Sequence, residues 1–292
     1  MPFPEPLGPT SRSFVSQRLR LNYLDWGNAQ APTLILIHGG RDHARSWDQV
    51  ALALREDWHV ICPDLRGHGD SAWSPDGAYT IPYFICDLAQ LIHQQDEAPV
   101  TIVAHSLGGA ISLRYAGLYP ERVRKLVAIE GVGLPSATSG MGVEKSFGTL
   151  WRDWIEERRS LATRQPRRYA SVEEALARMQ GENPHLTEAQ ARHLTIHGVA
   201  RNEDGSFSWK FDDYMRPGPP VDISPAELHA LWGNITCPIL LCWGQDSWAE
   251  NPLETGFATR FHNASVQTFD NAGHWLHHDQ FDRFIAALRA FL

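Results

Sequence analysis

The chain has 292 residues, of which 43% are hydrophobic and 21% are charged, and its formal net charge is -8. A chain of this length and composition can bury its own core without disulfide bonds. Its negative charge repels nucleic acid and anionic membranes, so neither is an expected partner. The chain has no apolar stretch of membrane-spanning length, and its start lacks the apolar segment of a secretion signal.

Short apolar runs alternate with helical patterns along most of the chain. Strands are predicted at residues 19–26, 33–38, 59–64, 100–105 and 125–130, and again at 238–243 and 265–269. Apolar side chains recur at helical period over residues 81–92 and 281–291. This alternation predicts an α/β fold with a mostly parallel central sheet and helices on both faces.

Residues 134–232 have a different pattern, mainly of helices with N-terminal capping signals. The capping pairs are Ser171 with Glu174, Thr187 with Gln190, and Ser224 with Glu227, the last with Pro225 at the first helical position. Residues 207–211 could form a short strand. We therefore expect a core formed by residues 14–133 and 233–292, a helical cap at 134–232 and an N-terminal arm at 1–13.

The predicted cap is rich in tryptophan. We expect most of these side chains to pack the cap onto the core, while one or two could line a substrate pocket. The tryptophans are Trp151, Trp154, Trp209 and Trp232.

Ser106 lies at the junction between the strand at 100–105 and a following helical pattern. A serine at such a sharp junction has its hydroxyl exposed, and the turn requires small neighbours, here Ala104 and Gly108. The junction also places the Leu107 amide beside the hydroxyl, at a helix N-terminus where it can stabilise an oxyanion. An isolated serine of this kind could instead simply cap the helix, but the strand–turn–helix context favours a nucleophile.

Four motifs in order along the chain resemble those of the α/β-hydrolase superfamily, specifically its branch with a helical cap. They are L-I-H-G-G at 36–40, P-D-L-R-G-H-G-D-S at 63–71, A-H-S-L-G-G at 104–109 and A-G-H at 272–274. The third motif has alanine where the family usually has its first glycine. The resemblance implies an α/β-hydrolase fold and a Ser-His-acid triad.

The resemblance also implies roles for individual residues. Gly40 would supply the second oxyanion amide, because it follows the H-G pair of the first motif. His274 would be the general base. Asp64, Arg66 and His68, in the second motif, would fix a loop beside the site. His277 and His278 compete with His274 for the role of general base by sequence alone. They lie one helical turn further on, so we expect them instead to be exposed or to cap a helix.

Two residues compete to be the acid that orients His274. Asp246 follows the strand at 238–243, which is the usual position in the superfamily and gives the order Ser, Asp, His. Glu130 ends the strand at 125–130, where some relatives place their acid and where an unpaired carboxylate would be costly. We favour Asp246 because of the chain order.

A serine at position 106 argues against epoxide hydrolases and haloalkane dehalogenases, which need a carboxylate nucleophile. We expect a hydrolase that cleaves esters of small hydrophobic molecules through an acyl-enzyme. The alternatives are a C–C bond hydrolase of ring-cleavage products and a non-catalytic ligand-binding relative. Arg41, Asp42 and His43 could contact a polar substrate group or form a solvated loop.

The sequence suggests no cofactor and no metal site, since zinc-binding and nucleotide-binding patterns are missing. The cysteines are Cys62, Cys86, Cys237 and Cys242, and their spacing fits neither zinc nor redox chemistry. Free buried thiols suit a cytoplasmic protein. The oligomeric state cannot be inferred from the sequence.

Overall fold

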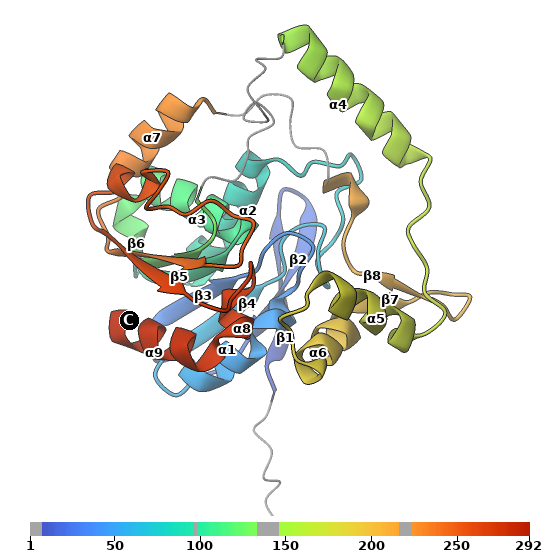
Figure 1. Ribbon diagram of the computed structural model, residues 1–292, viewed down its shortest axis with the longest axis horizontal. Helices are drawn as coiled ribbons and strands as arrows, with labels where there is room; N and C mark the ends of the chain where they lie inside the picture. Colours follow the sequence, from blue (N-terminus) through green and yellow to red (C-terminus); the bar gives the residue numbers. More distant parts are fainter. Residues whose placement is uncertain (1–7, 96–97, 133–145, 216–222) are drawn as a thin grey trace, which may run out of the picture.

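The computed structural model describes residues 8–95, 98–132, 146–215 and 223–292. Its centre is an eight-stranded sheet with the strand order β1-β2-β4-β3-β5-β6-β9-β10 (Figure 1). In this spatial order, every neighbouring pair from β4 onward is parallel. Strands β1 and β2 are antiparallel to each other, and β2 is also antiparallel to β4. The bounds are β1 (Thr10–Ser16), β2 (Leu19–Asp25), β3 (Thr33–Ile37), β4 (His59–Pro63), β5 (Val100–His105), β6 (Val123–Ile129), β9 (Ile239–Gly244) and β10 (Ala264–Phe269).

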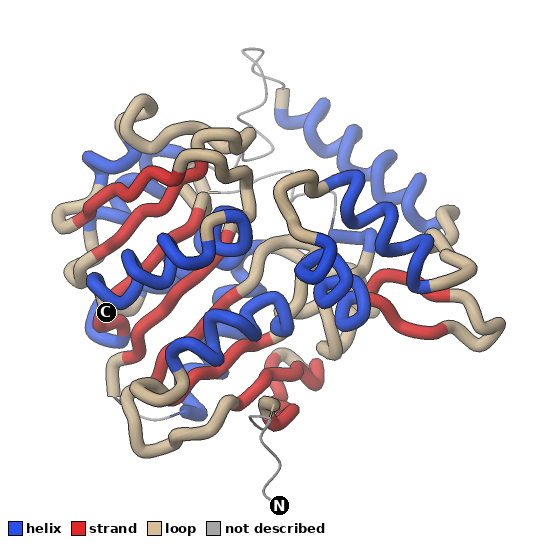
Figure 2. The backbone as a smooth tube through the Cα atoms, turned by 60° about the horizontal axis from the view of Figure 1, so that its bottom comes forward, coloured by secondary structure: helices blue, strands red, loops and turns tan. Residues whose placement is uncertain are grey.

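Helices cover both faces of the sheet (Figures 1 and 2). One face is covered by α2 (Ile81–Gln95), α3 (Leu107–Leu118) and α7 (Pro225–Gly233). The other is covered by α1 (Asp48–Leu54), α8 (Leu276–Asp279) and α9 (Phe281–Phe291). Successive side chains of the inner strands enter opposite apolar layers, which is why these strands are continuously apolar. Single-turn helices complete the connections at η1 (Ala44–Trp47), η2 (Pro120–Arg122) and η4 (Phe257–Arg260).

The predicted α/β class and the predicted strands of the sheet are confirmed, with bounds that differ by two residues or fewer. The predicted arm at 1–13 is wrong for residues 10–13, which belong to β1. This strand lies at the edge of the sheet, and its first four residues are exposed. Because both faces of that stretch meet solvent, it carries no hydrophobic pattern from which a strand could be predicted.

The described part of the cap contains α4 (Phe147–Ala162), α5 (Val172–Glu182), α6 (Glu188–Gly198), η3 (Asp213–Met215) and a two-stranded sheet of β7 (Val199–Arg201) and β8 (Phe207–Trp209). Reciprocal capping boxes begin α6 at Thr187 and α7 at Ser224. At α5, Ser171 accepts the Glu174 amide, but the Glu174 carboxylate accepts from Ala170 rather than closing the box.

The end of the predicted cap belongs to the core. Helix α7 packs against α3, and Trp232 on α7 is buried beside Phe261. The other boundary of the prediction falls in residues 133–145, which lie outside the described residues, as do 216–222. No helix in the described ranges has the length and apolar character needed to cross a membrane.

Candidate active site

Ser106 occupies a strained turn between β5 and α3. Its φ of 50° and ψ of -113° lie in a region that residues with side chains rarely adopt. Its amide donates to the carbonyl oxygen of Ile129 at 2.7 Å. A Cβ atom on Gly108 would lie 2.7 Å from the carbonyl oxygens of Ile37 and His38, so glycine is required two residues after the serine. The predicted strand–turn–helix junction is therefore present.

His274 lies between β10 and α8, with its ring directed at Ser106. Its Nε2 is 2.9 Å from the Ser106 Oγ. The carbonyl oxygen of His274 is 2.9 Å from the Nε2 of His105, which fixes the backbone at this point. The indole of Trp248 packs against the His274 ring, with 4.5 Å between centroids. The imidazole is 18% exposed, so it borders the site while remaining accessible to a substrate.

Glu130 is the carboxylate that contacts His274. Its Oε2 lies 2.5 Å from the His274 Nδ1, and its side chain is fully buried. Oε1 accepts the Gly244 amide at 2.8 Å, and Oε2 also accepts the Ser247 hydroxyl at 2.6 Å. The expectation that a carboxylate at this strand end needs a partner is confirmed, because both of its oxygens accept hydrogen bonds.

The prediction that Asp246 pairs with His274 is wrong. The Asp246 side chain is exposed, and its amide donates to the carbonyl oxygen of Ala272 at 2.9 Å. Glu130 already occupies the Nδ1 side of the ring. Strands β6 and β9 are neighbours and end at the same edge of the sheet, so either loop could supply the acid in the chain order Ser, acid, His. Chain order therefore could not separate the two candidates.

The two predicted oxyanion amides lie at the same cavity as Ser106. Gly40 and Leu107 both line it, and within the described residues neither amide meets an acceptor. The sequence reasoning overlooked Gly39. A Cβ atom there would lie 2.7 Å from the His105 Nδ1 and 3.2 Å from the Ser106 Cβ. The second position of the H-G-G motif is thus required to be glycine by packing against the nucleophile turn.

The cavity lies between the cap and the carboxyl ends of the strands and has a volume of about 640 Å³. Its walls are mixed in character. The apolar lining includes Met179, Pro184, Leu186, Trp209, Phe211, Trp248 and Trp275. The polar lining includes Arg41, Glu182, Asn183, His185, Asp246 and Asp279. Of the four tryptophans of the predicted cap, Trp209 lines this cavity.

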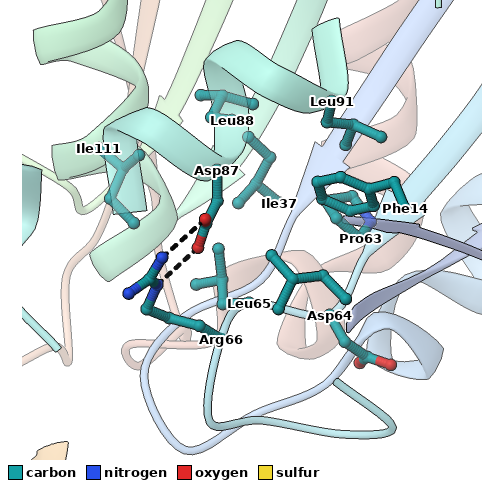
Figure 3. Close-up of a pocket in the computed structure, with 11 residues that line it drawn as sticks. Phe14, Ile37, Pro63, Asp64, Leu65, Arg66, Asp87, Leu88, Leu91 and Ile111 are labelled. Atoms are coloured by element: carbon teal, nitrogen blue, oxygen red, sulfur yellow. Dashed lines mark hydrogen bonds and ion pairs between the residues drawn. The ribbon is translucent and has the colours of Figure 1, made fainter. Parts of the chain in front are cut away.

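The second motif fixes the loop beside the site, as expected. Asp64 accepts hydrogen bonds from the amides of Ala44 and Asp70, at 2.7 and 3.0 Å. Arg66 forms a two-pronged ion pair with Asp87, at 2.6 and 2.7 Å (Figure 3). His68 accepts the Arg41 amide at 3.0 Å through Nε2, which anchors the turn that follows Gly40.

Only Arg41 of the 41–43 segment lines the cavity. Asp42 and His43 are buried, so they form neither a solvated loop nor a substrate contact. Asp42 accepts the His43 amide and the Ser46 hydroxyl, and burial raises the pKa of its carboxyl to about 7. His43 bonds through Nε2 to the carbonyl oxygen of Leu194 on α6, which joins the core to the cap.

His277 and His278 are also buried, contrary to the expectation that they are exposed or cap a helix. The His277 ring stacks on Trp47 with 4.7 Å between centroids. Burial lowers the pKa of His278 to about 3. Helix α8 is short and packs against the sheet, so the rings that follow His274 enter the core instead of solvent.

Comparison with known proteins places this fold and site in a family. The model described as "Alpha/beta hydrolase family" matches residues 34–287. The chain belongs to the alpha/beta hydrolase family. Together with the hydrogen-bonded Ser106 and His274, this membership makes it a serine hydrolase.

Several proteins resemble this hydrolase over much of its length. It is 28% identical to a serine hydrolase-like protein of Danio rerio over 80% of this chain and 72% of that protein. It is 27% identical to an esterase of Mycobacterium tuberculosis over 98% of this chain and 90% of that protein. The solved thioesterase domain from the curacin biosynthetic pathway has the same fold, with a TM-score of 0.83 at 21% identity, covering 97% of this chain and all of that domain.

Proposed function

We propose that the protein hydrolyses carboxylic esters of small molecules, with Ser106 as nucleophile, His274 as general base and Glu130 as the orienting acid. The observation that carries the proposal is the hydrogen-bonded chain from the Ser106 Oγ to the His274 Nε2, and from the His274 Nδ1 to Glu130. Ser106, at the end of this series of hydrogen bonds, faces an accessible cavity large enough for a small substrate.

In the first half of the reaction, His274 takes the proton from the Ser106 hydroxyl as its oxygen attacks the ester carbonyl carbon. The carbonyl oxygen gains negative charge, which the amides of Gly40 and Leu107 stabilise. Glu130 holds the Nδ1–H tautomer of His274 and stabilises the imidazolium that forms. His274 then donates its proton to the leaving alcohol, and an acyl-Ser106 ester remains.

In the second half, a water molecule enters the site of the departed alcohol. His274 removes a proton from this water as it attacks the acyl carbon, and the same two amides stabilise the second oxyanion. When the intermediate collapses, the Ser106 oxygen recovers the proton from His274 and the carboxylic acid leaves. The net reaction consumes one water molecule and needs no cofactor.

The lining of the cavity supports a small substrate with an apolar portion. Trp209, Phe211 and Trp248 offer aromatic surface to an acyl or alcohol group. Arg41 and Asp246 make the rest of the wall polar, so we propose a substrate that also carries a polar group. The esterase named among the relatives supports ester hydrolysis over the other reactions open to a serine nucleophile.

The central test compares three variants on an activated ester. Ser106→Ala should lower kcat by at least ~10³-fold, and Glu130→Gln by roughly 10²- to 10⁴-fold, because the His274 tautomer and imidazolium lose their support. Asp246→Asn removes the competing carboxylate and should keep kcat on this ester within a few-fold of the wild type, because Glu130 occupies the Nδ1 side of His274; any lost contact with a polar substrate group should appear in KM. The acid assignment fails if Asp246→Asn is the more damaging of the two acidic variants.

A panel of esters of increasing acyl length, assayed beside a vinylogous diketone, tests the substrate class. Turnover of the diketone without ester turnover would favour the C–C bond hydrolase. A fluorophosphonate probe that fails to label Ser106 would favour a ligand-binding relative. Labelling that is lost in variants of either Ser106 or His274 supports the proposal that the protein is an active serine hydrolase.

We propose a cytoplasmic location and a small-molecule partner instead of nucleic acid or a membrane. All four cysteines lie in the described residues and are free, and Cys86 is the exposed one. Exposed free thiols persist where the environment is reducing. The net charge of -8 opposes binding to polyanions. Fractionation of cells that express the chain tests the location.

A further inference from the structure

A second cluster of ligand-type side chains lies away from Ser106, where the cap meets the core. Asp48, His193 and His197 each direct a potential ligand atom to one place, and these atoms lie within 4.8 Å of one another. None of the three lines the cavity around Ser106. The cluster is therefore separate from the machinery of ester hydrolysis.

The cap contributes the two histidines. They are four residues apart on α6 and so lie on the same helix face, with 4.7 Å between ring centroids. Two histidines at this spacing on one helix form a chelating pair for zinc-like ions. Helix α6 packs against η1, directly before α1, which carries Asp48 (Figure 1).

The core contributes a carboxylate that is incompletely satisfied. Asp48 is 5% exposed, and its Oδ2 accepts from Arg45 at 2.7 Å and lies 3.2 Å from the His193 Nε2. Its Oδ1 is buried and has no hydrogen-bond partner among the residues that the structure describes. A buried carboxylate oxygen without a partner is costly, and binding a cation is one way to remove that cost.

We propose that Asp48, His193 and His197 form a binding site for a divalent transition-metal ion of the Zn²⁺, Co²⁺ or Ni²⁺ type. Two imidazole nitrogens and one carboxylate oxygen suit these ions better than Mg²⁺ or Ca²⁺, which prefer oxygen ligands alone. Water would complete the coordination. Because the ligands come from α1 and α6, the ion joins the cap to the core. The proposal departs from the expectation of no metal site, because the stretch from His193 to His197 lacks the glutamate of the His-Glu-x-x-His zinc pattern.

Two present contacts must change when the ion binds. The His193 Nε2 lies 3.0 Å from the carbonyl oxygen of Arg45, so the ion replaces a proton shared with that oxygen. The Arg45 guanidinium also pairs with Asp48 and repels a cation. Arg45 therefore weakens the site, and neutralising this side chain should strengthen it.

The test measures Zn²⁺ binding to the full chain by titration calorimetry and the visible absorption of bound Co²⁺. We expect one equivalent of either ion to bind. His193→Gln and His197→Gln should each weaken binding at least tenfold, whereas Arg45→Gln should tighten it. Saturating Zn²⁺ should raise the Tm of the wild type by a few degrees, and this increase should vanish in His197→Gln.

Exposed histidines away from the cluster provide the matched controls. His93→Gln and His262→Gln should bind Zn²⁺ as the wild type does. Circular dichroism and metal-free ester turnover establish that each variant is folded. The proposal is overturned if no ion binds, if both α6 variants keep the wild-type affinity, or if binding is lost only in His274→Gln, which would place the ion at the active site instead.

Discussion

At the scale of single residues, the end of β9 and the loop after it support the acid even though they do not provide it. Gly244 and Ser247 both donate to Glu130, at 2.8 and 2.6 Å. Glu130 itself has a φ of 52°, so its carboxylate is held by a strained backbone as well as by donors. The loop that carries Asp246 thus acts on His274 through Glu130.

We expect Ser247→Ala to lower kcat/KM by roughly tenfold to a hundredfold, since a hydrogen bond to a charged group contributes ~1.5–3 kcal/mol. The loss should fall mainly on kcat, because Glu130 acts on the imidazolium that forms during the reaction. Ser265→Ala, which removes an exposed hydroxyl that bonds to the carbonyl oxygen of Ile239, is the control and should leave both constants unchanged. An unchanged kcat in Ser247→Ala would rule out this supporting role.

The sequence was sufficient to locate Ser106, which follows the buried, mainly apolar strand β5, and His274, which is marked by the A-G-H motif after the short strand β10. It was not sufficient to choose between Glu130 and Asp246, since strand adjacency in space decides which carboxylate reaches the ring. The burial of His277 was likewise hidden, because it depends on how α8 packs on Trp47.

At the scale of elements, the inner strands were the most predictable. Both faces of β3 and β5 are covered, so most of their residues are apolar, and the polar Thr101 and His105 of β5 are buried as well. Edge strand β1 and helix α7 were misassigned because their patterns reflect neighbours distant in the sequence. β1 follows from pairing with β2, and α7 joins the core through contacts with α3.

The Arg66–Asp87 ion pair ties the second motif to α2 beneath the sheet. Beside it lies a small cavity of about 20 Å³ walled by apolar side chains that include Ile37, Leu88 and Ile111 (Figure 3). Both partners are almost fully buried, with side chains 1% and 6% exposed. Removing one partner therefore leaves an uncompensated charge in an apolar setting.

We expect Asp87→Ala to lower the free energy of unfolding by ~3–5 kcal/mol, measured by urea denaturation. The double variant Arg66→Met with Asp87→Leu should recover much of that loss, because it also removes the unpaired charge of the Arg66 guanidinium. Arg168→Met, which breaks an exposed pair with Asp204, should leave the Tm unchanged. A double variant as unstable as Asp87→Ala would show that shape, not charge, dominates here.

At the scale of the whole molecule, several histidines are buried or partly buried. Burial lowers the pKa of His38, His43, His68, His105, His197, His277 and His278, to about 4 for His68 and His197 and about 3 for His278. Unfolding returns each ring to an ordinary pKa of about 6.5, so below that pH the unfolded chain binds more protons.

Stability should therefore be greatest above pH 6.5 and fall as the pH decreases from there toward 3. Each such histidine contributes a slope of at most about 1.4 kcal/mol per pH unit, and only between its folded pKa and the ordinary value of about 6.5. The opposite trend comes from the raised pKa values of Asp42, Asp64 and Asp279 and of His193, which are fewer. Urea denaturation at pH 7 and pH 5 measures the net effect.

His277→Phe isolates one contribution. In the described part of the chain, neither ring nitrogen of His277 has a hydrogen-bond partner. Phenylalanine should therefore keep the stack on Trp47 while removing one proton-binding group. We expect a shallower loss of stability on acidification, and no change of slope for the exposed His93→Phe control. An identical slope in His277→Phe would contradict the assignment.

The strand order has a consequence for biosynthesis. Strand β6 pairs with β9, yet roughly 110 residues separate their facing ends, and at ~5–20 residues per second a ribosome needs several seconds to make them. During this time β6 is an unpaired, apolar edge next to the nascent nucleophile turn. The nascent hydrolase is thus both inactive and prone to aggregation until β9 and the residues after it have been synthesised. Chaperones that cover exposed strand edges should therefore matter most for nascent chains whose synthesis has stalled within the cap.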